Sequence, residues 1–160
     1  DNLFVAQFIG APMMNTFNTK LVNEGDKYHV EFFGAKIPVD GVKGKALVEK
    51  NVGSHDILLG VRPEHINLSK TANEASIPVT IQVNEMMGSE YHLHVLTEDG
   101  TKIIVRVPTI NLTEEERASM INGNVINLTF EGKAMHFFDP VSEVNLLANG
   151  TPVASGKVAE

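Results

Sequence analysis

The chain has 160 residues, a formal net charge of −7 and no cysteine. Hydrophobic residues make up 42% of the sequence and charged residues 21%, a balance typical of a globular domain and not of a disordered chain. The acidic excess argues against nucleic acid as the main partner, because affinity for nucleic acid depends largely on neutralising phosphates. The absence of cysteine excludes disulfides, thiolate metal sites and cysteine nucleophiles.

Residues 1–11 predict a short helix that precedes the main domain. Phe4 and Phe8 fall on one helical face, and Gly10 followed by Pro12 is a stop signal. Two turns of helix are too short to be stable alone. We therefore expect this helix to belong to a longer protein and to pack its Phe4 and Phe8 face on the rest of the domain or on a neighbouring domain.

Most of the remaining sequence predicts β-strands. Strands are expected at residues 16–22, 27–33, 35–39, 56–61, 77–87, 90–96, 102–107, 124–130 and 134–138. Hairpin turns are expected at residues 23–26, at Asp99-Gly100 and at residues 131–133, where the turn would join the last two strands.

One internal helix is predicted between the strands. Thr113 is its expected N-cap, Glu116 completes a capping box, and Gly123 is expected to end it. Many short strands with one short helix predict a mainly β fold, either a small barrel or a sandwich. Residues 12–147 are expected to form this domain, and residues 148–160 a polar C-terminal tail.

The sequence contains none of the common catalytic or phosphate-binding motifs. The patterns Gly-x4-Gly-Lys-Ser/Thr, Gly-x-Gly-x-x-Gly and Gly-x-Ser-x-Gly are all absent. His92 and His94 share one face of a strand and could ligate a metal, but no third ligand is evident nearby. We interpret them as polar positions on a solvent face, and we assign no catalytic, cofactor-binding or metal-binding residue.

One segment, residues 59–66, stands out. Arg62 and Glu64 flank Pro63, which ends an apolar strand, and His65 follows. An arginine–carboxylate pair at this point would hold the end of the strand in place. The same corner could instead bind a partner, although the spacing favours the structural role.

This segment resembles the Gly-Ile/Val-Arg-Pro-Glu-His/Asp signature of the C-terminal regulatory domain in ABC-transporter ATP-binding subunits of the maltose and multiple-sugar import group. Three other segments agree in order. Residues 2–15 are similar to the family's Phe-Val-Ala-x-Phe-Ile-Gly-x-Pro-x-Met-Asn, residues 83–90 to its Val-x-x-x-Glu-x-Leu/Met-Gly-x-Glu, and Phe138-Asp139 to its Phe-Asp near the C-terminus. The resemblance extends over residues 2–147.

The resemblance implies an OB-like β-barrel regulatory domain, often called a TOBE domain. In the family, two such domains pack together and hold the ATPase subunits together while the nucleotide domains open and close. Some members also receive regulatory partners. The resemblance further implies a cytoplasmic location on the inner face of the cell membrane, with indirect association with the membrane subunits of a sugar importer.

The parent subunit of such a domain would bind ATP and Mg²⁺ in a nucleotide-binding domain. The phosphate-binding loop, the Leu-Ser-Gly-Gly-Gln signature and the catalytic carboxylate of that domain have no counterpart in this sequence. We therefore expect no cofactor and no catalysis in this chain, and residues 1–11 would be the linker helix that follows the nucleotide-binding domain.

Arg62, Glu64 and His65 are the expected interface or regulatory residues, with Gly88 and Glu90 as second candidates. Gly88 is also expected to form a tight backbone turn.

Two other functions remain open. A small-ligand sensor for an oxyanion or a sugar is disfavoured for anions by the net charge, but a local cluster around Arg62 or Arg106 could override it. An OB-type binder of oligonucleotides or oligosaccharides is disfavoured because aromatic residues make up only 6% of the chain and tryptophan is absent.

Overall fold

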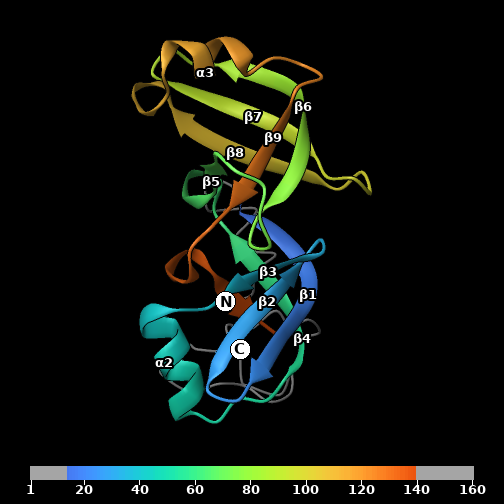
Figure 1. Cartoon of the computed structure of the whole chain (residues 1–160), viewed down its shortest axis with the longest axis vertical. Helices are drawn as coiled ribbons and strands as arrows, with labels where there is room; N and C mark the ends of the chain where they lie inside the picture. The colour runs from blue at the N-terminus through green and yellow to red at the C-terminus, as the bar shows by residue number, and fades with distance from the viewer. Residues whose placement is uncertain (1–13, 140–160) are drawn as a thin grey trace.

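The computed structural model describes residues 14–139, which contain ten β-strands, two α-helices and three short 3-10 helices. The strands form two five-stranded antiparallel sheets, which lie one above the other along the long axis of the molecule (Figure 1). The mainly β, OB-like fold class predicted from the sequence is confirmed. The predicted helix at 1–11, with Phe4 and Phe8, and the predicted tail at 148–160 lie outside the described residues.

The first sheet, sheet A, has the strand order β10-β4-β1-β2-β3. Its strands are β1 (Asn15–Glu24), β2 (Lys27–Phe32), β3 (Ala35–Pro38), β4 (His55–Val61) and β10 (His136–Phe138). A hairpin turn joins β1 and β2 at the predicted place, but it has two residues instead of the four expected at 23–26, because Glu24 and Lys27 still pair. Helix α2 (Gly41–Glu49) flanks this sheet in Figure 1.

The second sheet, sheet B, has the strand order β5-β9-β6-β7-β8. Its strands are β5 (Asn67–Ser69), β6 (Ile77–Met86), β7 (Glu90–Leu96), β8 (Lys102–Pro108) and β9 (Val125–Thr129). The strand predicted at residues 77–87 is present as β6, and Ile77, Val79 and Ile81 on one face are all buried. Val83 is 47% exposed, and the pairing of β6 with β7 shifts register between Ile81 and Val83. A 3-10 helix, η2 (Thr109–Asn111), and helix α3 (Glu114–Ser119) lie between β8 and β9.

The capping box predicted for α3 is formed. The backbone N–H of Glu116 donates to Thr113 Oγ1 at 3.0 Å, and the N–H of Thr113 donates to Glu116 Oε1 at 2.8 Å. The helix ends at Ser119, earlier than predicted. Gly123 instead donates its N–H to the carbonyl of Ile81 at 2.8 Å, so it belongs to the turn that leads into β9.

Helix α2 is not predicted from the sequence, which indicates a single internal helix near Thr113. Its sequence carries a weak signal, since Gly44 and Leu47 are the only residues of the helix that are buried. Gly44 allows a close approach to the end of β3: a Cβ added there would lie 2.3 Å from the carbonyl oxygen of Val39. Tertiary packing therefore outweighs the poor helix propensity of glycine.

The predicted hairpin around residues 131–133 is wrong. Strand β9 pairs with β5 and β6 in sheet B, whereas β10 pairs with β4 in sheet A. The chain passes between the sheets through η3 (Gly132–Ala134), and it makes the reverse passage from β4 to β5 through η1 (Pro63–His65). Because β4 pairs with β10 and β5 with β9, the two passages run side by side.

The two sheets share a hydrophobic core. The buried residues form a continuous cluster that draws on strands of both sheets and on Leu47 of α2. Phe32 of β2 and Phe130, directly after β9, meet edge to face with ring centroids 4.9 Å apart. This contact joins sheet A to the passage that leaves sheet B.

A single amide side chain also links the sheets. The Nδ2 of Asn15 donates to the carbonyls of Ile104 at 2.9 Å and Val61 at 3.2 Å, and its Oδ1 accepts from the N–H of Ile104 at 2.9 Å. Asn15 begins β1, and Ile104 lies in β8, at the edge of sheet B. The side chain thus satisfies edge groups that would otherwise lack a strand partner.

We expect Asn15→Ala to lower the free energy of unfolding by about 1–3 kcal/mol, because it leaves partly buried backbone groups of β8 unpaired. Urea denaturation followed by circular dichroism would measure this. Asn18→Ala, at an exposed position of the same strand, is the matched control. Equal losses in the two variants would contradict the linking role of Asn15.

Candidate functional site

The segment singled out from the sequence forms a corner between the two sheets. Arg62 is extended, with φ −71° and ψ 145°, as expected for a residue that precedes proline. Pro63 is buried and begins η1, and the N–H of His65 donates to the carbonyl of Arg62 at 2.9 Å. Ile66 then returns to the core. Arg62 therefore lies just before the turn and Glu64 lies within it, with Pro63 between them.

Arg62 and Glu64 do not pair with each other in the part of the chain that the structure describes. Glu64 Oε1 instead lies 3.8 Å from Nη1 of Arg106, a residue of β8. The arginine–carboxylate pair suggested by the spacing is therefore formed with a more distant arginine.

Arg106 joins two of the predicted candidates. Its Nη2 donates to Glu90 Oε2 at 2.8 Å and to Oε1 at 3.2 Å, and Glu90 Oε2 lies 2.9 Å from Nε2 of His92. We call Glu64, Arg106, Glu90 and His92 the charged ladder. Hydrogen bonds from His92 and then from Arg106 hold the pKa of Glu90 below its ordinary value.

A second histidine–carboxylate pair extends the same face of sheet B. His94 Nε2 lies 2.7 Å from Glu85 Oε1, and this hydrogen bond lowers the pKa of Glu85. His92 and His94 thus contact different carboxylates. Among residues 14–139, no group of three or more histidine and carboxylate side chains is placed to hold a metal ion.

Gly88 forms the turn between β6 and β7, as predicted, with a φ of +75° that favours glycine. The carbonyl of the next residue, Ser89, accepts hydrogen bonds from the N–H of Thr109 at 2.9 Å and from its Oγ1 at 3.1 Å. These bonds hold η2 against the β6–β7 turn.

Three large apolar side chains are exposed around this turn. Met86 is 65% exposed, Met87 is 56% exposed, and Ile110 of the adjoining η2 is 89% exposed. We call these three residues the apolar tip. It lies next to the charged ladder, because Met87 donates its N–H to the carbonyl of Glu90 at 2.9 Å.

Arg62 and His65 belong to a different group of side chains. His136 of β10 is the register partner of Gly60, two residues before Arg62. Lys43 of α2 donates its Nζ to the carbonyl of Met135. We call Lys43, Arg62, His65 and His136 the basic corner. Burial, followed by the charges of Lys43, Arg62 and His65, lowers the pKa of His136 to about 4.

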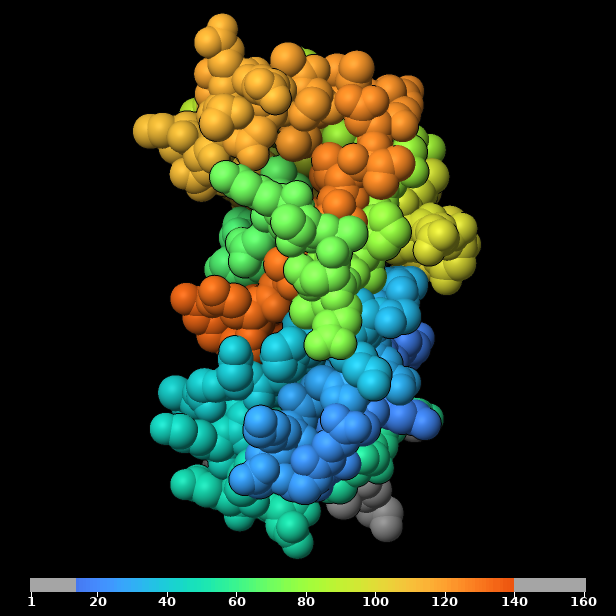
Figure 2. All heavy atoms as spheres, viewed as in Figure 1, coloured from blue at the N-terminus to red at the C-terminus, as the bar shows by residue number. Residues whose placement is uncertain are grey.

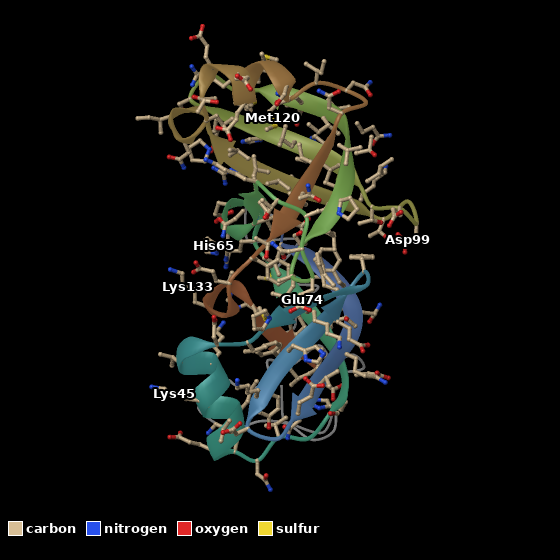
Figure 3. All side chains as sticks on the ribbon, viewed as in Figure 1. Lys45, His65, Glu74, Asp99, Met120 and Lys133 are labelled. Atoms are coloured by element: carbon tan, nitrogen blue, oxygen red, sulfur yellow. The ribbon has the colours of Figure 1, made fainter. Side chains whose placement is uncertain are left out.

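A cavity of about 630 Å³ opens between the edges of β5 and β8, beneath α3. Glu64 and Arg106 of the charged ladder line one end, and Leu112 and Met120 contribute apolar surface. Figure 3 shows Met120 beside α3 and His65 near the passage between the sheets.

Sequence reasoning missed Lys43 and His136. Neither belongs to a motif. They come close because α2 packs against η3 (Figure 2), the turn that leads into β10, and because β10 pairs with β4. The sequence indicates Arg106 only as a possible contact for an anion. The alternation in β8, where Ile103, Val105 and Val107 are buried, would have placed it on the outer face, although not beside Glu64.

Comparison with known families identifies the chain. The family model described as TOBE domain matches residues 59–138, half of the sequence. The chain belongs to the TOBE-domain family. A second family model, described as MalK OB fold domain, matches residues 10–66. The two matches overlap at residues 59–66, the segment that forms the corner between the sheets. Neither matched family is an ATPase domain.

The relatives of this TOBE domain are ATP-binding proteins of importers. It is 32% identical over 146 residues to the multiple sugar-binding transport ATP-binding protein MsmK of Streptococcus mutans, with 89% of this chain and 36% of the relative covered. It is 29% identical over 150 residues to the oligosaccharides import ATP-binding protein MsmX of Bacillus subtilis, with 91% and 38% covered. The predicted resemblance to the TOBE and OB-fold region of importer ATP-binding subunits is confirmed.

The osmoprotective compounds uptake ATP-binding protein GgtA of Synechocystis is 31% identical over 125 residues, with 75% of this chain and 33% of the relative covered. The TOBE chain therefore spans 33–38% of the length of these three relatives. Among solved structures, the molybdate-binding protein ModG shares the fold, with a TM-score of 0.58 and 13% identity, and 81% of this chain and 96% of ModG covered.

We expect Arg106→Gln to raise the pKa of Glu90 towards its ordinary value, because the substitution removes a positive charge and two hydrogen bonds. It also leaves the carboxylates of Glu64 and Glu90 without the cation between them. Carboxyl NMR titration would measure the change. Arg106→Lys should restore part of the shift, and an unchanged Glu90 pKa in Arg106→Gln would contradict the ladder.

We expect His136 to make the TOBE domain less stable as the pH falls from 6.5 towards 4. In this window the unfolded ring, with an ordinary pKa of 6.5, binds a proton that the folded ring does not. The loss is smaller than about 1.4 kcal/mol per pH unit, the limit for one proton, because the ring is only half-buried and water screens its charge.

Urea denaturation at pH 7 and pH 5 would test this expectation. His136→Gln should lose less stability than the unsubstituted chain between the two pH values. Asn18→Ala, at an exposed position of β1 without a titratable side chain, is the control and should keep the original pH dependence. Identical pH dependence in His136→Gln and the unsubstituted chain would contradict the prediction.

Proposed function

We propose that this chain is the regulatory and dimerisation domain of the ATP-binding subunit of a sugar-import ABC transporter. It holds two ATP-binding subunits together and does not itself catalyse a reaction. The TOBE and OB-fold matches and the import ATP-binding proteins among its relatives support this proposal. ATP and Mg²⁺ would bind in the nucleotide-binding domain of the parent subunit.

The apolar tip is the observation that carries the dimerisation proposal. Met86, Met87 and Ile110 expose three large apolar side chains at adjoining turns, and clustered exposed apolar surface marks interaction sites on soluble domains. The charged ladder beside the tip supplies polar groups for the rim of such an interface. Contact with a second copy of the chain would bury this surface.

The other proposed partners follow from the same role. The domain would contact its own nucleotide-binding domain, and through it would associate indirectly with the membrane subunits of the importer. Its location would then be the inner face of the cell membrane. None of the helices among residues 14–139 is long and apolar enough to span a membrane. A regulatory protein would be a further partner for the exposed surface.

We expect light scattering across a concentration series to show a dimer that dissociates on dilution. Met87→Asp and Ile110→Asp should each raise the dissociation constant about tenfold or more, because a desolvated carboxylate is unfavourable in an apolar contact.

Val42→Asp is the matched control, since Val42 is 84% exposed on α2 and lies outside the apolar tip. It should leave the dissociation constant unchanged. A strict monomer at every concentration would contradict the dimerisation proposal for this chain and would favour a small-ligand role. Equal effects of all three substitutions would show that the apolar tip is not the contact.

A further inference from the structure

We propose that the basic corner, formed by Lys43, Arg62, His65 and His136, binds a phosphate group. This inference goes beyond the proposed function, because it concerns different residues from the apolar tip and a small ligand instead of a second chain. The sequence left a small-ligand role open around Arg62 or Arg106, and the structure favours Arg62, since Arg106 is engaged by Glu64 and Glu90.

Backbone geometry brings the four side chains together. His136 is directly opposite Gly60 in the β10–β4 pair, so residues 60 and 136 share a face of sheet A. Arg62 lies two residues beyond Gly60 along the extended chain, which makes it a diagonal neighbour of His136. Gly60 itself has no side chain, and the Sδ of Met14 occupies the space that a Cβ at this position would take.

Hydrogen bonds to the backbone hold His65 beside Arg62 and Lys43 beside His136. The N–H of His65 donates to the carbonyl of Arg62 at 2.9 Å, and Nζ of Lys43 donates to the carbonyl of Met135, the residue before His136. In Figure 1, α2 and η3 lie on the same side of the molecule, and Figure 3 shows His65 on that side as well. Three separate segments thus converge on one corner.

Glu64 and Glu131 line a pocket together with His65, but each of these carboxylates is paired with a cation outside the basic corner. Glu64 is paired with Arg106, and Glu131 with Lys133 at 3.4 Å. Asp40 lies over Gly132, where its Oδ1 would be 2.9 Å from an added Cβ. Among residues 14–139, no carboxylate forms an ion pair with any member of the basic corner. The corner therefore concentrates positive charge in a chain whose net charge is −7.

The electrostatics of His136 support an anion at this position. Its pKa is lowered to about 4, first by burial and then by the charges of Lys43, Arg62 and His65, which disfavour a further positive charge on the ring. An anion between these groups would reverse the repulsion and favour protonation. None of the four side chains is fully buried, so a small solute can reach them.

A phosphate group matches the chemistry of these donors. The planar fork of an arginine binds two oxygens of a tetrahedral oxyanion, a lysine supplies a point charge, and histidine rings donate N–H bonds. A doubly charged group interacts with several cations at once, which distinguishes it from chloride. The ligand could be inorganic phosphate or the phosphate monoester of a small metabolite, and the experiment separates the two.

The test is an NMR titration of the histidine rings of the full 160-residue chain with inorganic phosphate, at an ionic strength kept constant with sodium chloride. We expect saturable shifts of the His65 and His136 signals and a rise in the pKa of His136. Lys43→Gln and Arg62→Gln should each weaken phosphate binding about tenfold or more. A parallel titration with glycerol phosphate shows which form binds more tightly.

Lys45→Gln is the matched control, because Lys45 is exposed on the same helix and the substitution removes the same charge. It should leave the affinity unchanged. Shifts that do not saturate, or equal weakening by Lys45→Gln and Lys43→Gln, would overturn the proposal by showing a general effect of charge. If Arg62→Gln does not fold, Lys43→Gln still decides the result. The dimerisation measurement uses other residues, so either proposal can fail alone.

Discussion

The rest of the structure depends on the two passages of the chain between the sheets. Strands β4 and β10 pair in sheet A, and β5 and β9 pair in sheet B, so both passages must turn at the same level. Pro63 starts one turn because it cannot continue the strand ladder. Gly132 permits the other, since a Cβ there would lie 2.8 Å from the backbone nitrogen of Asp40. The continuous core could not form without this alignment.

The turn at Pro63 also separates opposite charges. Arg62 remains at the end of sheet A with Lys43 and His136, whereas Glu64 passes to sheet B and meets Arg106. A direct ion pair between Arg62 and Glu64 would have neutralised both groups locally. Separation instead produces a basic surface and a charged ladder within a few residues of each other, which explains how an acidic chain can carry a site suited to an anion.

The charged ladder and the apolar tip lie next to each other in sheet B. Glu90 follows the Gly88 turn directly, and η2 is held to that turn by the bonds from Thr109 to Ser89. An interface at the apolar tip would therefore change the surroundings of Glu90 in the charged ladder. The pKa of Glu90 depends on its hydrogen bonds with His92 and Arg106. The basic corner has its own partners, so the proposed self-association and the proposed phosphate binding involve separate contacts.

The sequence by itself determined the features that depend on neighbouring residues: the alternation of β6, the capping box of Thr113, the turn at Gly88 and the motifs that resemble the family. The tertiary structure decided the rest. Helix α2 forms where local helix propensity is weak, and β9 and β10 join different sheets. Glu64 forms its ion pair with Arg106, an arginine 42 positions further along the chain. Local sequence patterns indicate the preferred backbone conformation and the side of an element that is buried. Pairing between distant segments depends on which strands share a core, and no single stretch of sequence specifies that pairing.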